Sequence, residues 1–365
     1  MGFTTVESNR HLPEVHSGSR SHWPVQETCI TLAHGSGGKA MADLIADVFV
    51  SRFENPALAL LNDQALVSLP NMPSLGNRLA LTTDSYVVDP LFFPGGDIGA
   101  LAINGTVNDL AMSGATPLYL TCGVILEEGL PLDTLRRVVD SMAQAAARAG
   151  VQVVAGDTKV VPRGSADKLF INTAGVGLVP EGISLSPQHI QPGDVVLVNG
   201  PIGDHGAAIT VARADLALES CIESDCQPLN GLVEAILAAC PQVRAMRDAT
   251  RGGLATVVNE FALAAQVGFR LEEAGIPVRP AVQGLCEMLG LDPLYLANEG
   301  RVVVVAPSAD AEAVLAAMQS HPAGHDSQII GKVLAEPVGL VLLKTAFGSD
   351  RILDRLVGDQ LPRIC

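Results

Sequence analysis

The chain has 365 residues, with 23 Lys and Arg against 39 Asp and Glu, and a formal net charge of −16. This charge, without a run of basic residues, excludes nucleic acid and anionic lipid surfaces as partners, because phosphate-rich surfaces require positive charge. No apolar stretch approaches the roughly 20 residues that span a bilayer, and the first 26 residues lack the apolar block of a secretory signal. We therefore expect a cytoplasmic protein without membrane segments.

Hydrophobic periodicity predicts the elements in chain order. The first half is expected to hold strands and helices at residues 79–82 (strand), 98–112 (helix), 119–126 (strand), 132–149 (helix) and 151–154 (strand). The second half is expected to hold elements at residues 195–198 (strand), 206–216, 229–239 and 254–265 (helices) and 302–306 (strand). This mixture predicts the α/β class.

The domain division follows from length and composition. At about 100–200 residues per domain, the length predicts two domains, and Pro and Gly cluster at residues 180–193 between apolar runs. Residues 1–26 are polar and aperiodic, so we interpret them as a mobile extension whose removal leaves the function intact. Residues 27–180 and 181–355 are the two predicted domains, and residues 356–365 are a predicted mobile tail.

The run GSGGK at residues 35–39 places closely spaced glycines before a lysine. Such glycines let backbone N–H groups point into one concavity, where the lysine adds positive charge for a phosphate. The Walker pattern fails, because it needs glycine in place of Ala33 and a hydroxyl in place of Ala40. A phosphate loop of another kind and a flexible turn both stay open. The nucleotide-binding candidates here are Gly35, Gly37, Gly38 and Lys39.

Three aspartates lie at or near the ends of expected elements: Asp84 in TTDS, Asp109 in NDLAMSGA and Asp157 in GDTKVV. Carboxylates that converge from separate elements suit Mg2+, a hard cation that prefers oxygen ligands and bridges to nucleotide phosphates. The alternative is that all three cap loops, since aspartate is common in turns. Their presence in a chain with GSGGK favours a nucleotide.

Two further runs precede expected helices. DATRGG, residues 248–253, can present a helix N-terminus to an anion, or it can be a capped helix start with Asp248 or Thr250 as the cap and Arg251 in solvent. NGPIGDHGAA, residues 199–208, follows a strand and opens a helix. Its glycine spacing differs from the dinucleotide-binding fingerprint, so a dinucleotide is disfavoured.

The chain ends on Cys365, in the run LPRIC. A thiol on a terminal segment can be reached by another protein and suits a substrate carried on the chain. The adjacent carboxylate disfavours the thiolate, so activation has to come from a site into which the tail is inserted. The alternative is a terminal cysteine without a role. A CaaX lipidation motif is excluded, because its cysteine stands fourth from the end.

Taken together, GSGGK, TTDS, NDLAMSGA, GDTKVV, DATRGG, NEG (residues 298–300) and the final PRIC resemble, in the same order, the motifs of the HypE family of hydrogenase maturation factors. The resemblance runs from about residue 28 to Cys365. The wider superfamily includes aminoimidazole ribonucleotide synthetase, selenophosphate synthetase and thiamine-monophosphate kinase, and the terminal cysteine distinguishes HypE among them.

The resemblance implies a two-domain α/β (α+β) fold like that of aminoimidazole ribonucleotide synthetase. It implies a homodimer whose amino-terminal sheets join, with ATP and Mg2+ in the cleft beside the interface. Cys365 would be carbamoylated by the carbamoyltransferase HypF, and the protein would dehydrate that group with ATP to a thiocyanate. The cyano group would pass to a HypC–HypD complex that builds the iron ligands of NiFe hydrogenase.

This chemistry gives the motif residues expected roles. A base must remove the nitrogen protons of the amide as its phosphorylated oxygen leaves. Glu299 of NEG is the candidate base, and Lys159 of GDTKVV is the candidate that orients the amide or stabilises charge. Either side chain could instead form a structural salt bridge. The expected catalytic residues are Cys365, Glu299 and Lys159, the metal ligands are Asp84, Asp109 and Asp157, and Asp248 and Arg251 line the nucleotide site.

Two other functions stay open. A small-molecule kinase or synthetase of the same superfamily would leave Cys365 incidental. A non-catalytic carrier would present Cys365 to partners, but it would need neither GSGGK nor three metal-suited aspartates. For the tail we expect alternation between a position inside the cleft and one outside it.

Overall fold

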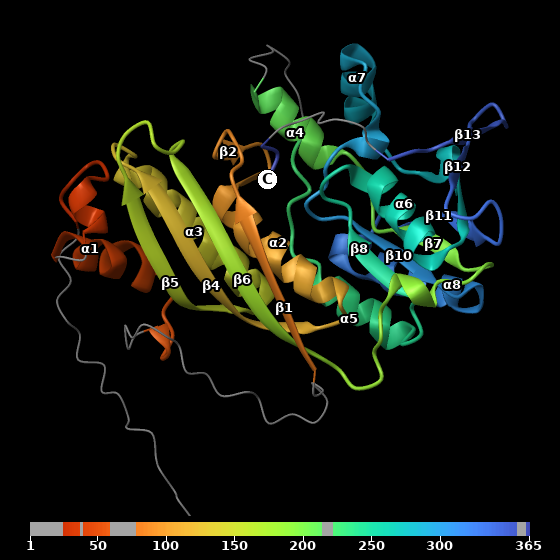
Figure 1. Ribbon diagram of the computed structural model, residues 1–365, viewed down its shortest axis with the longest axis horizontal. Coiled ribbons are helices and arrows are strands. Elements are labelled where there is room, and N and C mark those ends of the chain that lie inside the picture. Colours follow the sequence, from red (N-terminus) through yellow and green to blue (C-terminus); the bar gives the residue numbers. More distant parts are fainter. Residues whose placement is uncertain (1–24, 37–38, 59–77, 214–221, 356–362) are drawn as a thin grey trace, which may run out of the picture.

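The computed structural model describes residues 25–36, 39–58, 78–213, 222–355 and 363–365. In these ranges the chain folds into two α/β domains that lie side by side, as the sequence predicts (Figure 1). Most of the expected extension (residues 1–24) and the tail segment 356–362 lie outside the described residues. Of the helices in the described ranges, none is long and apolar enough to cross a membrane.

The N-terminal domain is a sheet with helices on one face. Its strands are β1 (Arg78–Tyr86), β4 (Thr116–Glu127), β5 (Gln152–Val161) and β6 (Leu169–Val179), in the order β1-β6-β4-β5. The β4–β5 pair is parallel and the other pairs are antiparallel. Helices α2 (Ile98–Met112) and α3 (Leu132–Ala149) cover one face (Figure 1). On the other face, Leu79, Leu81 and Ile125 are exposed, so a large apolar part of the sheet is uncovered within the described residues.

Shorter elements flank this sheet. Segments η1 (Leu32–Gly35), α1 (Lys39–Leu44) and η2 (Ile45–Val50) lie together, and η1 contacts β5. A small hairpin of β2 (Phe92–Phe93) and β3 (Gly96–Asp97) precedes α2. Asp97 caps α2, because its carboxylate accepts hydrogen bonds from the N–H groups of Gly99 and Ala100.

The two long helices bury their residues differently. Helix α3 is amphipathic, with one apolar face on the core, and it ends at Gly150, whose φ of +72° is the left-handed conformation that glycine adopts without strain. Helix α2 is buried all round except at Asp109 and Met112. A helix that is apolar on every side needs cover on every side. The N-terminal sheet and α3 provide part of that cover, and β8 and α5 of the C-terminal domain provide the rest.

The C-terminal domain is a larger sheet with helices on both faces. Its strands are β7 (Val195–Val198), β8 (Ala245–Asp248), β9 (Gly268–Glu272), β10 (Val302–Ala306), β11 (Gln328–Leu334), β12 (Val341–Lys344) and β13 (Asp350–Ile352), in the order β13-β12-β9-β11-β7-β10-β8. Helix α6 (Gly253–Ala265) packs on one face, and α5 (Asn230–Ala239) and α8 (Ala311–Ser320) pack on the other. Helices α4 (Asp204–Arg213) and α7 (Pro280–Leu289) pack on each other.

Most predicted elements are confirmed, some to the residue, as for α2, α3, β7 and β10. The predicted strands at 79–82 and 151–154 are too short: β1 runs on through Asp84, and β5 through Asp157 and Lys159. Polar residues were read as strand ends, although a strand with one solvent-facing side accepts them at alternate positions. The end of the predicted helix at 206–216 lies outside the described residues.

Candidate active site

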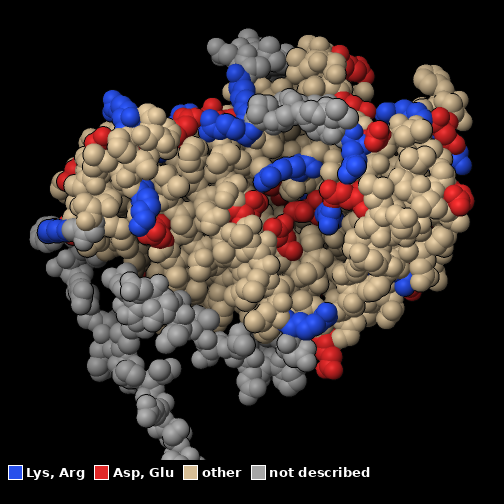
Figure 2. Space-filling model, in the orientation of Figure 1, with Lys and Arg blue, Asp and Glu red and all other residues tan. Residues whose placement is uncertain are grey.

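Three motif-bearing segments of the C-terminal domain meet at one edge of its sheet. Val198 at the end of β7 pairs with Val303, and Asp248 at the end of β8 pairs with Val302. The runs that follow β7 and β8 and the run NEG before β10 therefore lie together. Because α2 contacts β8, this edge faces the N-terminal domain. Figure 2 shows Asp and Glu side chains gathered in a hollow between the two domains.

Four carboxylates, two from each domain, interact at this edge. We call them the interdomain cluster: Asp84 of β1, Asp109 of α2, Asp248 of β8 and Glu299 of NEG. The Thr82 hydroxyl donates a hydrogen bond of 2.8 Å to Asp109, and the Arg251 guanidinium lies 3.5 Å from Asp84. Among the described residues, Arg251 forms an ion pair with Asp84, and the charge of Arg247 acts on Asp109 and Asp248. Two guanidinium groups against four carboxylates leave the cluster with excess negative charge.

Burial and mutual repulsion raise the pKa values of this cluster. The pKa of Asp248 is raised to about 7, mainly by burial and next by the charge of Asp109. The pKa of Glu299 is raised well above its ordinary value by burial, then by Asp248 and Asp225. Burial also raises the pKa of Asp109, although the hydrogen bond from Thr82 opposes it. Such shifts in a cleft are typical of groups that move protons or bind cations.

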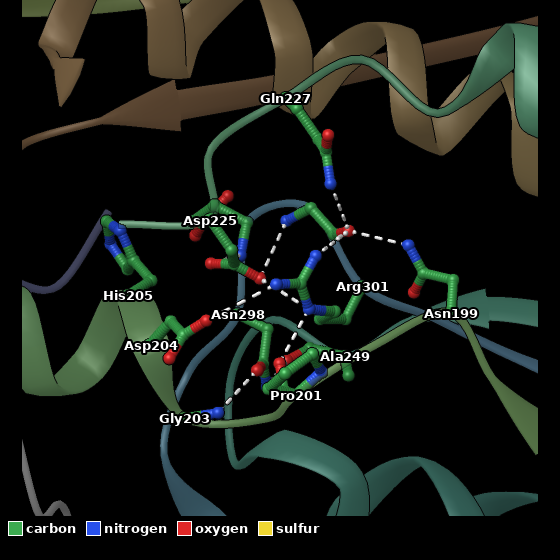
Figure 3. Close-up of polar contacts among 12 residues, drawn as sticks. Asn199, Pro201, Gly203, Asp204, His205, Asp225, Gln227, Ala249, Asn298 and Arg301 are labelled. Carbon is green, nitrogen blue, oxygen red and sulfur yellow. Dashed lines mark hydrogen bonds and ion pairs between the residues drawn. The ribbon is translucent and has the colours of Figure 1, made fainter. Parts of the chain in front are cut away.

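The backbone of NEG is held by a buried aspartate that the sequence analysis missed. The Asp225 carboxylate accepts hydrogen bonds from the N–H groups of Glu299 (3.0 Å) and Gly300 (3.3 Å), and Arg301 lies 3.6 Å from it (Figure 3). A side chain at position 300 would place its Cβ 1.9 Å from the Asp225 carbonyl oxygen, so this position requires glycine. The Glu299 Oε1 atom is buried and has no hydrogen-bond partner among the described residues, which leaves it available to a ligand.

Asparagines join the segments around NEG. The Asn298 side chain accepts from the Gly203 N–H (2.7 Å) and donates to the Ala249 carbonyl (2.9 Å), so it ties together the segments after β7 and β8 (Figure 3). Asn108 of α2 donates to the Gln227 carbonyl (3.1 Å) and accepts from the Leu229 N–H (2.7 Å). These bonds fix the position of the base candidate relative to both domains.

The last residue of the chain lies in the same hollow. Figure 1 marks the C-terminal end between β2 and α4. The Cys365 thiol receives a hydrogen bond from Arg251 and interacts with the charge of Glu299. Its pKa is raised to about 11, first by burial and then by Glu299, while Arg251 opposes the rise. The thiol is therefore protonated at neutral pH and lies beside the candidate base. The mobility of the tail stays a prediction.

The remaining motif residues lie at the opposite edge of the N-terminal sheet, which we call the β5 edge. Gly35 packs closely on β5, since a Cβ there would approach Val160 to 2.8 Å. Lys159 lies 3.1 Å from Asp157, and both side chains are exposed. Lys39 is exposed and pairs with Asp43. Gly37 and Gly38 lie outside the described residues.

A cavity of about 480 Å³ opens at the β5 edge. Helical residues of α1 and η2 form one wall, and β5 with Cys122 of β4 forms the other. Its lining is mostly apolar, and Asp157 and Thr158 add polar atoms. Apolar pockets with a few polar groups are the usual shape of small-molecule sites.

The structure does not bring all the predicted metal ligands together. Asp84 on β1 pairs with Thr173 on β6, and Thr173 pairs with Cys122 on β4. Cys122 in turn pairs with Gly156 on β5, the residue before Asp157, so three strand spacings separate Asp84 from Asp157. That distance is about 14 Å at the usual strand separation. In the described part of the chain, no group of three His, Cys, Asp or Glu side chains is placed to hold a metal ion. Asp84 and Asp109 are neighbours, and Asp157 is not beside them in this chain.

The alternative that Asp248 or Thr250 caps a helix is wrong, because the N-cap of α6 is Gly252 and no side chain caps this helix. Lys159 forms a salt bridge with Asp157, which agrees with the alternative of a structural pair for this side chain. Among residues that the analysis missed, Asn108 and His205 lie inside quoted runs and are buried polar residues among apolar neighbours. That signal could have identified them. Asp225 lies in no motif.

Comparisons with known proteins agree with the two-domain fold. The sequence matches the AIR synthase related protein family, with the N-terminal domain at residues 61–179 and the C-terminal domain at residues 191–343. A protein from Rhodobacter capsulatus named carbamoyl dehydratase HypE is 55% identical over 92% of this chain and 98% of its own length. A protein of the same name from Escherichia coli (strain K12) is 54% identical over 92% of this chain and 99% of its own length.

Solved structures are similar over the same extent. A hydrogenase maturation protein HypE in complex with ATP has 48% sequence identity and a TM-score of 0.87, and the match covers 92% of this chain and 99% of that chain. The HypE of E. coli has 52% identity and a TM-score of 0.85 over 89% of this chain and 100% of that chain. A chain of a HypE–HypF complex has 47% identity and a TM-score of 0.75 over 86% of this chain and 99% of that chain.

Proposed function

The chain belongs to the family of HypE carbamoyl dehydratases, and from this premise we propose that it dehydrates an S-carbamoyl group on Cys365 to a thiocyanate with ATP, during NiFe hydrogenase maturation. One observation carries the proposal. The Cys365 thiol lies in a hollow between the domains, hydrogen-bonded to Arg251 and close to Glu299, whose buried Oε1 atom has no hydrogen-bond partner among the described residues. A substrate on the chain's last residue would thus meet a base and a cation.

The net reaction removes one oxygen and two hydrogens from the carbamoyl nitrogen and carbon. The S–C bond stays intact, the C–O bond breaks, and the C–N bond becomes a triple bond as the nitrogen loses both protons. When bound, ATP would supply a phosphoryl group to the amide oxygen and release ADP, so that the oxygen could leave as phosphate. The chain's own residues therefore have to bind the amide, accept protons from its nitrogen and hold charge near its oxygen.

Glu299 is suited to accept the nitrogen protons. A carboxylate with a raised pKa is a stronger base than an ordinary one, and catalysis is most efficient when that pKa lies near the working pH. The hydrogen bonds that the backbone N–H groups of Glu299 and Gly300 donate to the Asp225 carboxylate hold the base in place. Arg251 reaches both Asp84 and the Cys365 sulfur, so its charge lies where the amide oxygen leaves.

The residues fit a divalent cation and a nucleotide. The interdomain cluster carries excess negative charge, and Mg2+ commonly binds through one or two carboxylates, with phosphates and waters completing its shell. Asp84 and Asp109 would hold it, and Asp248 would line the nucleotide site. At the β5 edge, the cavity would take the adenine base, Gly35, Gly37, Gly38 and Lys39 would cover the phosphates, and Lys159 would orient the amide.

Because the two edges lie about 14 Å apart in one chain, we propose that a complete site combines the β5 edge of one subunit with the interdomain cluster of the other. The uncovered face of the N-terminal sheet supports a homodimer, because Leu79 and Leu81 are 57% and 75% exposed there. Asp157 would then reach the metal from the partner subunit. Symmetric homodimers are the commonest oligomers, and a shared site needs only one such interface.

The proposal includes partners and a compartment. A HypF-type carbamoyltransferase would load Cys365, in agreement with the solved HypE–HypF complex, and a HypC–HypD complex would accept the cyano group. A free thiol on Cys365 is required, and thiols stay reduced in the cytoplasm. We therefore assign the protein to that compartment.

The test is the mass of the C-terminal peptide. The protein is first incubated with HypF, carbamoyl phosphate and MgATP, and a non-hydrolysable ATP analogue is added after carbamoylation to block dehydration. ATP is then restored to allow dehydration. We expect the peptide to gain a carbamoyl group and then lose one water. C365A should show neither change, whereas C29A, which alters a half-buried cysteine at a β-bridge to Pro131, should behave as the wild type.

Two outcomes would contradict the proposal. An unmodified Cys365 in the presence of active HypF, with ATP turnover unaffected in C365A, would indicate a small-molecule kinase or synthetase. Carbamoylation that is never followed by loss of water would indicate a carrier.

A further inference from the structure

The last three residues of the chain are held by a set of hydrogen bonds to their carbonyl oxygens. The Arg363 carbonyl accepts from the Arg213 guanidinium, the Ile364 carbonyl accepts from His205 Nε2 at 2.8 Å, and the Cys365 carbonyl accepts from the Val87 N–H at 3.0 Å. Each carbonyl thus has a different donor. Backbone recognition of this kind sets which residue of a segment occupies which position.

His205 is the buried donor of this set. It lies in the first turn of α4 (Figure 3) and is fully buried. Its ring packs edge-on against Phe93 of β2, with 5.4 Å between ring centroids. The Arg213 side chain, in contrast, is only half-buried where it donates to the tail. Arg363, which belongs to the tail, is exposed and pairs with Asp167 at 2.5 Å. A hydrogen bond made by a buried group is the one whose loss leaves a polar atom without water.

A chain of hydrogen bonds fixes the proton of His205 on the tail side. The Ser224 hydroxyl oxygen accepts from the Cys226 N–H at 3.1 Å, and it lies 2.8 Å from His205 Nδ1. The Ile364 carbonyl can only accept, so Nε2 carries the proton and donates it. In a neutral ring Nδ1 then carries no proton and accepts from the Ser224 hydroxyl. Burial lowers the pKa of His205, which keeps the ring neutral and preserves this tautomer.

We propose that His205, oriented by Ser224, is the positioning residue that sets the register of the tail and so holds the sulfur of Cys365 at Arg251 and Glu299. The reacting thiol is one residue beyond the carbonyl that His205 binds. If that bond is lost, the tail can slide or withdraw, and the thiol leaves the hollow. This inference about tail docking stands on the hydrogen bonds alone, while its consequence for catalysis rests on the proposed function.

The first test measures docking without any reaction. Iodoacetamide alkylates thiolates, and withdrawal of the tail exposes a thiol that is otherwise half-buried with a pKa raised to about 11. We expect H205A to raise the alkylation rate of Cys365 about tenfold, the effect of one lost hydrogen bond. H205Q keeps an N–H group near the position of Nε2 and should raise the rate less than about threefold. H189Q, which changes an exposed histidine in the segment before β7, should leave the rate unchanged.

S224A tests the orientation of the His205 ring, and it provides a second variant in case H205A does not fold. Without the Ser224 hydroxyl, the proton can move to Nδ1, and two acceptors then face each other at the Ile364 carbonyl. We expect faster alkylation of Cys365 with an unchanged rate at Cys29 in the same sample. Equal rates in the wild type, S224A and any folded H205A would overturn the proposal, as would equal rates in H205A and H205Q.

The second test links docking to catalysis. In protein that already carries the carbamoyl group, H205A and S224A should slow the loss of water in a single turnover at saturating MgATP, and H205Q should restore most of the rate. Carbamoylation by the HypF-type partner should not be slowed, because that step uses the withdrawn tail. Unchanged single-turnover rates would overturn the positioning role. If even the wild type never loses water, the proposed function fails while the alkylation result still decides tail docking.

Discussion

The interdomain cluster and the β5 edge are built from motifs of equal prominence in the sequence, yet they differ in physical character. The cluster is a region of buried charge, and hydrogen bonds that involve Asp225, Asn298 and Asn108 hold the segments around Glu299 in place. At the β5 edge, Lys39 and Lys159 are exposed and pair with aspartates of their own segments. The first region is pre-arranged for chemistry, and the second is an open surface with a cavity. This difference supports the proposal that the two regions are halves of one site that meet between subunits.

The strongest way to test the cluster is E299Q. Glutamine keeps the size of the side chain but cannot take a proton, so the loss of water from carbamoylated Cys365 should slow about a thousandfold, the usual contribution of a general base. Carbamoylation itself should continue at the wild-type rate. The measurement is single-turnover peptide mass spectrometry, with E260Q, which alters a carboxylate paired with Arg247, as the control. A fully active E299Q would remove Glu299 from the mechanism.

Mixing inactive variants tests whether the two regions work across subunits. K159A and E299Q should each be inactive as homodimers, but a dimer containing one of each has one site with neither change. After random exchange at equal amounts, about one quarter of the wild-type activity should return, because half of the dimers are mixed and each has one intact site of two.

The control for this mixing is E299Q with C365A. Both residues belong to the hollow of one chain, so no site in the mixed dimer has both, and no activity should return. Recovery in this second mixture, or none in the first, would show that the halves are assigned to the wrong subunits.

The smallest effect concerns stability. Asp248 has a raised pKa of about 7 in the folded chain and an ordinary value near 4 when unfolded. Between those values the folded chain holds a proton that the unfolded chain has released, so the free energy of unfolding falls as pH rises through that window. D248N removes this dependence and should add about 2 kcal/mol at pH 8, with a smaller gain at pH 5.5.

Urea unfolding at the two pH values measures this difference. D133N changes an exposed carboxylate at the start of α3, and it should show the same offset from the wild type at both values. A gain for D248N that does not depend on pH would mean that Asp248 is ionised in the folded chain throughout.

The sequence predicted the fold class, most elements and the identity of the residues in the interdomain cluster. Asp248, Arg251 and Glu299 were found because each lies in a short run next to an apolar strand, and that local pattern is visible in the sequence. Their meeting depends on the pairing of Asp248 with Val302, which no local pattern shows. The separation of Asp157 from Asp84 has the same origin. The strand order β1-β6-β4-β5 places their strands, β5 and β1, at opposite edges of the sheet, and no local pattern shows this order.

Asp225 and Ser224 could not have been found in this way. They lie in an irregular segment between two helices, without a motif or a periodic pattern, and their roles exist only because that segment packs against NEG and α4. His205 was visible as part of GDHG, but its partner is the Ile364 carbonyl 159 residues away. Contacts of this range follow from the assembled fold.

The close packing around α2 limits how the two domains can move during turnover. Because almost every side of this helix is packed, by the N-terminal sheet on one side and by β8 and α5 on the other, a hinge between the domains would have to pull buried side chains into water. The short terminal segment can leave its hollow by breaking a few hydrogen bonds. Structures captured at successive stages of turnover should therefore superimpose as one rigid body, with the differences confined to the final residues and the nucleotide-facing loops.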